Sequence, residues 1–328
     1  MIDSFGREIM YLRVSVTDHC NYKCFYCREE DDSAGSIREN LLSNSELTRI
    51  IRIFTELGVT KIRLTGGEPL VRKNIVDLIE SVGAIDLITD FSMSTNGHLL
   101  AKNSEKIYKA GLTRLNISID SLEEKSFAKI TRGGDLNIVL DGISTAIKVG
   151  FKPIKINMVV MQGTNEHEIE NMLDYAIANN LQLRYIETMP IGKSGIEAFC
   201  QHYPSDKILG RIRAYLKTDL ELLENKKTAG PATIYSINNS GATVGVISAV
   251  SQHFCETCNR VRLTSTGQLV LCLGQENSIS LKDAIRDLKT DEEIKSMILE
   301  AINKKPEKHD FNENKFNIVN QTMVSLGG

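Results

Sequence analysis

Six of the seven cysteines fall into two triplets, and this spacing is the strongest chemical signal in the 328-residue chain. The first triplet is Cys20, Cys24 and Cys27, and the second is Cys255, Cys258 and Cys272. A cubane iron–sulfur cluster has four irons and is normally held by four thiolates. Three thiolates at short spacing leave one iron open to bind a small molecule. The triplets therefore predict two open clusters, one for a cofactor and one for a substrate.

Structural zinc is the main alternative for these triplets. Zinc sites are four-coordinate and closed, and His19 or His253 could supply the additional ligand. For the second triplet taken alone, zinc and an iron–sulfur cluster fit equally well. Disulfides fit less well, because the chain opens Met-Ile-Asp-Ser-Phe-Gly without an apolar signal segment, which predicts a reducing, cytoplasmic location. Cys200 is left over as an ordinary thiol.

The composition excludes several classes of protein. A hydrophobic content of 41% and a charged content of 25% are typical of a soluble globular protein. No apolar run approaches the length that a membrane-spanning helix needs. The net charge of −3 argues against a general nucleic-acid binder. It leaves room for a local basic pocket.

Apolar, β-branched runs alternate with amphipathic helical patterns over the first part of the chain. This alternation predicts an α/β fold with a parallel sheet and helical crossovers. Six strand–helix units are too few for a closed eight-stranded barrel, so we expect a partial (β/α)6 TIM-type barrel. The predicted strands are residues 11–17, 61–65, 90–95, 115–120, 154–160 and 182–188. The clearest predicted helices are residues 45–57, 136–149 and 166–179.

The pattern changes after about residue 200, which predicts a second, C-terminal region. We place residues 1–230 in the partial barrel and residues 231–328 in an α+β extension that carries the second triplet and closes the barrel. A helix is expected at 206–216, and a connection at 226–231 leads to strands at 232–237 and 243–250. Strands at 261–263 and 268–271 are expected to form a hairpin that returns Cys272 towards the other two cysteines. Two more helices are expected before the Gly327-Gly328 end.

Polar and glycine-rich segments follow the predicted strands at their carboxyl ends. In parallel barrels, active-site residues gather at that rim. Each segment alone is better explained as an ordinary turn, but together with the first triplet they form one constellation. The segments are Gly66-Gly67-Glu68-Pro69, Ser94-Thr95-Asn96-Gly97, Ser118-Ile119-Asp120 and Glu187-Thr188-Met189-Pro190, with Lys155 and Asn157 inside the fifth strand.

Basic residues alternate with apolar ones along several strands, so their side chains can project into the barrel. A solvated or structural charge is the usual explanation for any one of them. Together they indicate a polyanionic substrate such as a nucleoside triphosphate, because arginine binds phosphate through bidentate hydrogen bonds. The set is Arg13, Arg63, Lys155, Arg184, Arg260 and Arg262.

The first triplet resembles that of the radical S-adenosylmethionine (SAM) superfamily. The resemblance rests on Cys20-x3-Cys24-x2-Cys27, with Tyr26 before the last cysteine, and on the Gly-Gly-Glu-Pro segment. The resemblance implies that SAM binds the open iron of a 4Fe–4S cluster through its amino and carboxylate groups. One-electron reduction then yields a 5′-deoxyadenosyl radical that abstracts a hydrogen atom from the substrate.

The whole chain resembles the GTP 3′,8-cyclase family of molybdenum cofactor biosynthesis. The further features are Asn-Ile-Ser-Ile-Asp, Cys-x2-Cys-Asn-Arg-Val-Arg with Cys272, and the terminal Gly-Gly. The family implies a second 4Fe–4S cluster that binds guanine. It also implies hydrogen abstraction from ribose C3′ and addition of the resulting carbon radical to C8, which gives (8S)-3′,8-cyclo-7,8-dihydroguanosine 5′-triphosphate.

The resemblance also implies roles for individual residues. Catalytic roles fall on Arg13, Arg260, Arg262, Gly327 and Gly328. SAM contacts or their supports are Tyr26, Gly66, Gly67, Glu68, Ser118, Asn157 and Met189. GTP contacts are Arg13, Arg63, Ser94, Lys155, Arg184, Arg260 and Arg262. The diglycine tail is expected to reach the active site; the plain alternative is an exposed, frayed end.

The implied partners are GTP, a downstream cyclic pyranopterin monophosphate synthase, and an electron donor such as flavodoxin or ferredoxin. A homodimer is compatible with the sequence, and neither a nucleic acid nor a membrane is expected as a partner. Two other functions stay open. One is a radical SAM enzyme that modifies a peptide or protein through an auxiliary cluster. The other is a non-enzymatic zinc- or cluster-bearing binding module.

Overall fold

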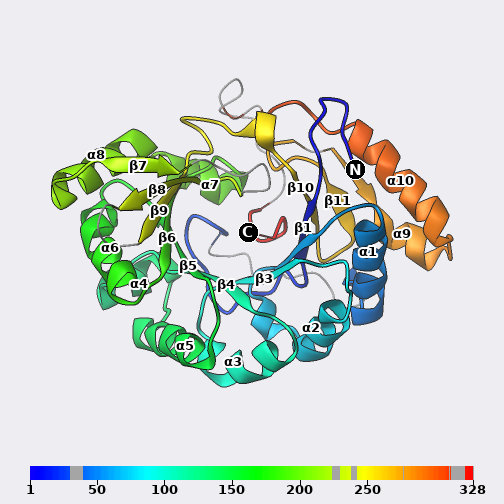
Figure 1. Ribbon diagram of the computed structural model, residues 1–328, viewed down its shortest axis with the longest axis horizontal. Coiled ribbons are helices and arrows are strands. Elements are labelled where there is room, and N and C mark those ends of the chain that lie inside the picture. The colour runs from blue at the N-terminus through cyan, green and yellow to red at the C-terminus, as the bar shows by residue number, and fades with distance from the viewer. Residues whose placement is uncertain are drawn as a thin grey trace.

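A twelve-stranded sheet with helices along its outer face forms the core of the protein, as seen in a computed structural model (Figure 1). The structure describes residues 1–29, 40–223, 230–237, 242–275, 277–309, 311 and 322–327. Most of the predicted connection at 226–231, and Gly328, lie outside the described residues.

Six parallel strands, consecutive in the chain, confirm the predicted partial barrel. Each pairs in parallel with the next. The observed bounds match the prediction for β2, β3 and β5 and differ by one or two residues at the ends of the others. The strands are β1 (Tyr11–Ser15), β2 (Lys61–Thr65), β3 (Asp90–Thr95), β4 (Arg114–Ser118), β5 (Ile154–Val160) and β6 (Gln182–Glu187).

Helices cover the outer face of this sheet, while the C-terminal end of the chain lies in the middle of the ring (Figure 1). They are α1 (Asn44–Glu56), α2 (Ile75–Gly83), α3 (Leu100–Lys109), α4 (Glu124–Thr131), α5 (Leu136–Val149) and α6 (Ile169–Ala178), with α7 (Gly192–Phe199) and α8 (Ser205–Leu216) after β6. The short 3-10 helices are η2 (Pro69–Val71), η3 (Glu166–Glu168) and η4 (Cys255–Thr257).

The first crossover shows how local sequence fixes an element. Ser43 caps α1, accepting a hydrogen bond from the backbone of Glu46, whose own side chain accepts one from the Ser43 backbone. This reciprocal capping box satisfies two backbone donors at the helix start. The helix ends at Glu56 with Leu57 as its C-cap, one residue before the glycine expected from the sequence. Gly58 follows with φ +96°, a conformation that glycine enters without steric cost, and so turns the chain after the helix.

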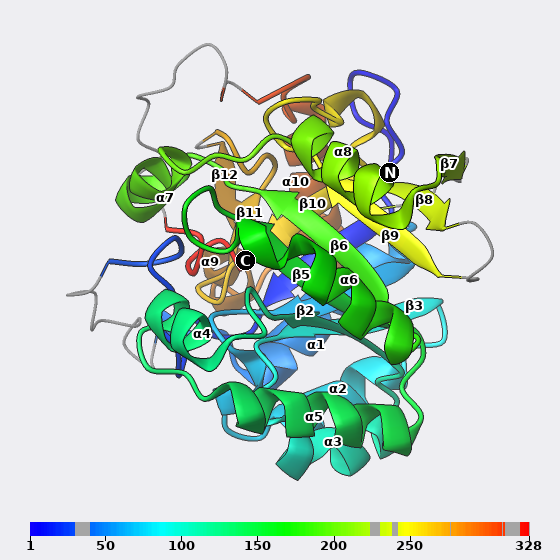
Figure 2. The same ribbon diagram turned by 90° about the vertical axis from the view of Figure 1, so that its left-hand side faces the viewer.

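The C-terminal region extends both edges of the barrel sheet. Strand β10 (Arg260–Leu263) pairs in parallel with β1, and β9 (Thr243–Ile247) pairs in parallel with β6. Antiparallel strands complete each side: β11 (Gln268–Val270) and β12 (Ser278–Ser280) beyond β10, and β8 (Thr233–Ile237) and β7 (Leu220–Leu223) beyond β9. Figure 2 shows β6, β9 and β8 side by side. The division into two domains at residue 230 stays a prediction.

The predicted hairpin and the two final helices are also present. Strands β10 and β11 pair antiparallel. Helices α9 (Leu281–Arg286) and α10 (Asp291–Asn303) pack beside α1 (Figure 1). No helix in the described part of the chain combines the length and apolar character needed to cross a membrane.

Candidate active site

Both cysteine triplets line one cavity of about 800 Å³ inside the barrel. Nearly all the side chains singled out from the sequence line it too. These are Arg13, Tyr26, Arg63, Gly66, Gly67, Ser94, Ser118, Lys155, Asn157, Arg184, Met189, Arg260 and Arg262. The predicted gathering of the strand-end segments and the strand cations around one cavity is therefore observed.

The register of the sheet places the arginines in a row. Arg262 of β10 pairs with Arg13 of β1, which pairs with Arg63 of β2. Arg63 in turn pairs with Ser92 of β3, and Ser92 pairs with Arg114 of β4. Strands in a sheet lie about 4.8 Å apart, and residues paired across them share a face. Arg262, Arg13 and Arg63 therefore stand side by side on the inner face of the barrel, and Arg114 follows beyond Ser92.

Burial among like charges lowers the pKa of these cations. Burial first, and then the charge of Arg262, lowers the pKa of Arg13 well below its ordinary value. Burial followed by Arg260 lowers the pKa of Arg262 to about 10. Burial followed by Arg184 lowers the pKa of Lys155 to about 6. Negative charge in the cavity would offset both causes, so the site fits a polyanionic ligand.

The first triplet lies in the loop after β1 and is held by the diglycine that follows β2. Gly67 donates a backbone hydrogen bond to Thr17 O (2.8 Å), and Glu68 donates one to His19 O (2.8 Å). A Cβ at Gly66 would lie 2.4 Å from Thr17 O, and one at Gly67 would lie 2.4 Å from His19 O. The sequence suggested that these glycines make room for a ligand. The structure shows that they also make room for the cysteine loop itself.

Glu68 is buried and does not line the cavity. Its carboxylate accepts hydrogen bonds from Thr95 Oγ1 (2.8 Å), Asn96 N (2.7 Å) and Leu70 N (3.0 Å). Burial raises the pKa of Glu68 to about 7, although these donors act in the opposite direction. Asn96 in turn places its Nδ2 3.8 Å from the sulfur of Cys20. Glu68 thus fits the supporting role expected of it, by bracing the loop after β3 against the first triplet.

Tyr26 is fixed by a buried carboxylate that sequence reasoning did not select. Its hydroxyl donates to Asp120 Oδ2 (2.7 Å), while Asp120 Oδ1 accepts from Val159 N (2.8 Å). Burial raises the pKa of Asp120 to about 6, against the effect of these two hydrogen bonds. Asp120 could have been selected from the sequence, because it lies just beyond β4 within Asn-Ile-Ser-Ile-Asp.

We expect Tyr26→Phe to destabilise the protein by roughly 1–3 kcal/mol, because a buried acceptor loses its donor. The hydrogen bond from Tyr26 stabilises the charged form of Asp120, whose pKa is about 6. The loss of folding stability should therefore be larger at pH 8, where Asp120 is charged, than at pH 5.5, where it is mostly protonated. Urea unfolding at both pH values measures this. Tyr108→Phe is the matched control, since the Tyr108 hydroxyl has no hydrogen-bond partner among the described residues. Equal losses at both pH values would contradict the prediction.

The second triplet is assembled by η4 and the β10–β11 hairpin. Cys255 and Cys258 lie at the two ends of η4, and Cys272 follows β11. Burial would raise the pKa of Cys258, but the charges of Arg260, Lys305 and Arg7 outweigh it and lower that pKa. The predicted return of Cys272 to the other two cysteines is observed, since all three line the same cavity.

Sulfur spacing separates zinc from an iron–sulfur cluster. Zn–S bonds of about 2.3 Å bring the sulfurs of a tetrahedral zinc site to about 4 Å from one another. Among the described residues, which include both triplets, the one trio of potential ligand atoms lying within 4.8 Å of one another is Glu123, His167 and Glu168. Neither triplet has all three sulfurs within 4.8 Å of one another, so neither is as compact as a tetrahedral zinc site.

The C-terminal tail lies against β1 and β2. Gly327 is buried, and its carbonyl oxygen accepts hydrogen bonds from Arg13 (3.1 Å) and Thr65 (2.9 Å). It adopts φ +78°, and a Cβ there would lie 3.0 Å from Ser15 Cβ and Thr65 Cγ2. The alternative of an exposed, frayed end is therefore wrong for Gly327. Gly328 lies outside the described residues.

Four further cations line the cavity and were missed from the sequence: Arg28, Lys61, Arg114 and Lys305. The two-residue period that selected Arg63 extends to Lys61, and the same period on β4 relates Arg114 to Ser118. Lys61 and Arg114 could have been found in this way. Lys305 follows α10 in the run Asn303-Lys304-Lys305-Pro306, which looks like a solvated helix end. Nothing in the sequence indicated that Lys305 is buried.

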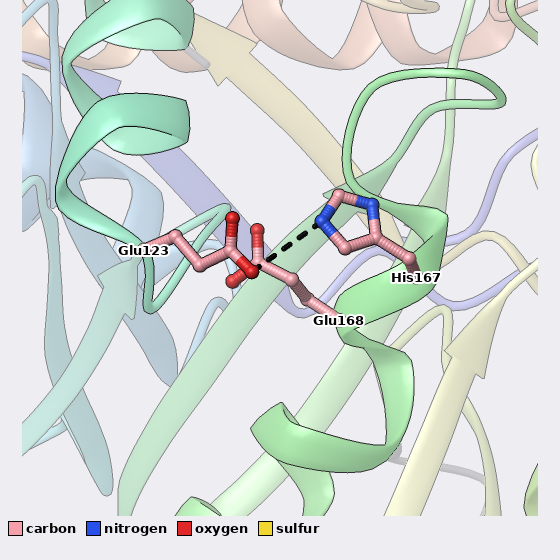
Figure 3. Close-up of side chains that lie close together, drawn as sticks. All are labelled: Glu123, His167 and Glu168. Atoms are coloured by element: carbon pink, nitrogen blue, oxygen red, sulfur yellow. Dashed lines mark ion pairs between the residues drawn. The ribbon is translucent and has the colours of Figure 1, made fainter.

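Figure 3 shows the compact trio Glu123, His167 and Glu168. None of the three lines the cavity. His167 Nε2 is 3.6 Å from Glu123 Oε1, and both side chains are more than half exposed. Glu168 is buried, and its carboxylate accepts hydrogen bonds from Ser121 Oγ and Leu122 N, each at 2.6 Å. These contacts account for Glu168 as a brace between the loop after β4 and the start of α6.

Comparison with protein families gives two matches that together cover most of the chain. Residues 14–176 match the radical SAM superfamily, and residues 181–311 match the family described as Molybdenum Cofactor Synthesis C. The boundary between the matches falls before β6.

Full-length relatives share one description. The chain is 53% identical to a GTP 3′,8-cyclase of Hydrogenovibrio crunogenus over 329 aligned residues, covering 100% of this chain and 99% of the relative. It is 41% identical to a GTP 3′,8-cyclase of Saccharophagus degradans, covering 100% and 98%. A crystal structure of Streptococcus suis SuiB bound to S-adenosylmethionine superposes with a TM-score of 0.65 at 15% identity, covering 98% of this chain and 77% of SuiB. At that identity the likeness shows the fold alone.

Proposed function

The chain belongs to the GTP 3′,8-cyclase family of radical SAM enzymes, and from this premise we propose which residues hold the cofactors and the substrate. The enzyme converts GTP to (8S)-3′,8-cyclo-7,8-dihydroguanosine 5′-triphosphate, the first step of molybdenum cofactor biosynthesis. It uses SAM and a 4Fe–4S cluster.

Cys20, Cys24 and Cys27 are proposed to hold the SAM-binding cluster. SAM bound there would supply, on one-electron reduction, a 5′-deoxyadenosyl radical that abstracts the hydrogen atom at ribose C3′. Bonding of C3′ to guanine C8 would leave a radical on the guanine, which would take up one further electron from the reductant and a proton to give the dihydro product. The protein orients the cofactor and keeps water out. Contacts or supports are assigned to Tyr26, Gly66, Gly67, Glu68, Ser118, Asn157 and Met189. Asp120 positions Tyr26 through the 2.7 Å hydrogen bond.

Cys255, Cys258 and Cys272 are proposed to hold a second 4Fe–4S cluster that binds the guanine of GTP. Their position in the cavity shared with the first triplet supports this, as does a spacing wider than that of zinc ligands. A substrate bridging the two triplets would present its ribose to SAM. Gly327, held by Arg13 and Thr65, would border that space.

The single observation that carries the GTP assignment is the row of arginines that lines the same cavity as the two triplets. Arg262, Arg13 and Arg63 stand at one level of the sheet, and the cavity they line contains the cysteines of both triplets. Planar guanidinium groups bind phosphate oxygens bidentately, so the row suits a triphosphate. The proposed GTP contacts are Arg13, Arg63, Ser94, Lys155, Arg184, Arg260 and Arg262.

An anaerobic turnover assay with reductant, SAM and GTP deuterated at C3′ tests the proposed function. Deuterium in the 5′-deoxyadenosine, read by mass spectrometry, would locate the abstracted hydrogen on the GTP ribose. Unlabelled 5′-deoxyadenosine, formed in a yield independent of GTP, would retain the radical SAM chemistry and reject the substrate. A peptide- or protein-modifying enzyme would then be the better assignment.

GTP binding is expected to take up a proton through Lys155. Burial and neighbouring arginines lower its pKa to about 6, so the side chain is mostly neutral at pH 7.5 in the free protein. Phosphate oxygens beside it favour the charged form, so binding should take up to about one proton, and affinity should fall as pH rises above 6. Calorimetry in buffers of different ionisation enthalpy measures the uptake. Lys155→Gln should take up about one proton fewer, and equal uptake in both proteins would contradict the assignment.

The remaining partners are proposed from the same premise. A low-potential donor such as flavodoxin or ferredoxin would reduce the first cluster, and a cyclic pyranopterin monophosphate synthase would consume the product. A cytoplasmic location and a homodimer stay predictions.

A further inference from the structure

Lys305 is a buried lysine that the proposed mechanism leaves unused. Only 2% of it is exposed, and it lines the cavity next to the second triplet. Its Nζ donates a hydrogen bond to Leu271 O at 2.6 Å, and Leu271 directly precedes Cys272. No carboxylate in the described part of the chain forms an ion pair with it. An ammonium group has three N–H donors, so two are left for other acceptors.

The segment that carries Lys305 is anchored to the opposite side of the same triplet. Arg7 donates hydrogen bonds to Cys255 O (2.9 Å), Pro306 O (2.6 Å) and Glu307 O (2.6 Å). Asp3 neutralises Arg7 through an ion pair of 2.6 Å. The position of Lys305 is thus fixed twice: its own side chain donates to Leu271 O, and Arg7 holds the two residues that follow Lys305. Lys305 cannot turn to solvent without breaking these hydrogen bonds.

Burying an ammonium group without an opposite charge costs several kcal/mol. The triplet supplies negative charge close to this ammonium group, because Leu271, which accepts its hydrogen bond, directly precedes Cys272, and all three cysteines line the same cavity as Lys305. Three thiolates around a cubane core carry a net negative charge, which increases by one on reduction. A fixed positive charge beside them stabilises the reduced state more than the oxidised state.

We propose that Lys305 is a positioning residue for the second cluster: its ammonium group balances the negative charge of the cluster held by Cys255, Cys258 and Cys272 and raises its reduction potential. This inference rests on the proposed second cluster. It differs from a substrate contact, because the effect on the potential exists before GTP binds.

A redox titration of the reconstituted enzyme without GTP, followed by electron paramagnetic resonance, tests the proposal. In Lys305→Met the second cluster should be harder to reduce. At the wild-type midpoint the ratio of reduced to oxidised cluster should fall about tenfold, equal to about 59 mV for a one-electron couple. Lys305→Arg keeps the charge and should restore most of the wild-type ratio. The first cluster should titrate unchanged in both variants.

Matched variants make the outcome decisive. Lys304→Met changes the adjacent exposed lysine and should leave both clusters unchanged. If Lys305→Met assembles no second cluster, Lys305→Gln keeps a hydrogen-bond donor without the charge and is titrated instead. An unchanged potential together with weaker GTP binding would overturn the proposal and make Lys305 a substrate contact. Wild-type protein with about four irons and a single cluster signal would instead reject the second cluster itself.

Discussion

Replacement of Cys20 by serine is expected to reduce SAM cleavage to background. Serine leaves the first cluster with two thiolates, and a neutral hydroxyl is a poor iron ligand. The iron content should fall from about eight to about four per chain, because each cubane contributes four. The second cluster should remain, since its cysteines lie on η4 and after β11, in segments that do not include the loop after β1.

Anaerobic assays of 5′-deoxyadenosine formation, with iron analysis of the same samples, measure both effects. Cys200→Ser is the matched control, because Cys200 is exposed and does not line the cavity. It should keep full iron and full cleavage. Cys272→Ser should show the reverse pattern to Cys20→Ser, with SAM cleavage retained and GTP turnover lost. Zinc in place of iron in anaerobically purified wild-type protein would contradict the assignment of both triplets.

The barrel strands could be predicted because their side-chain pattern is local. In β5, buried positions alternate with partly exposed ones along Ile154–Val160, and the predicted bounds are correct. The same two-residue period identified the cations that line the cavity. Asp120 and Lys305 were missed because their importance depends on burial, and burial at these positions comes from segments distant in the sequence.

Pairing between distant strands could not be read from local patterns. The sequence predicted a C-terminal extension, but gave no reason for β10 to pair in parallel with β1 or for β9 to pair with β6. These two pairings decide the geometry of the site. They place the second triplet at one end of the arginine row and bring Arg262 beside Arg13. Loss of the β10–β1 pairing would leave Arg13 without Arg262 as its neighbour.

Replacement of Arg262 by alanine is expected to weaken GTP binding by about 10- to 150-fold. Hydrogen bonds to a charged group contribute about 1.5–3 kcal/mol, which corresponds to that range. Calorimetric titration with GTP in the absence of reductant measures the affinity, and iron analysis checks that both clusters are present. Arg262→Lys should fall between alanine and the wild type, because lysine keeps the charge and loses the bidentate geometry.

The same substitution should change the stability of the free protein much less than it changes the stability of the GTP complex. Burial first, and then Arg262, lowers the pKa of Arg13, so the two guanidinium groups destabilise each other when no polyanion is present. Removing Arg262 relieves that repulsion, so the free protein should lose little stability, whereas the GTP complex loses a ligand. Arg213→Ala, at an exposed position on α8, is the control for losing one positive charge. Undiminished GTP affinity in Arg262→Ala would remove Arg262 from the site, and with it the reason for the arginine row to be buried in the barrel.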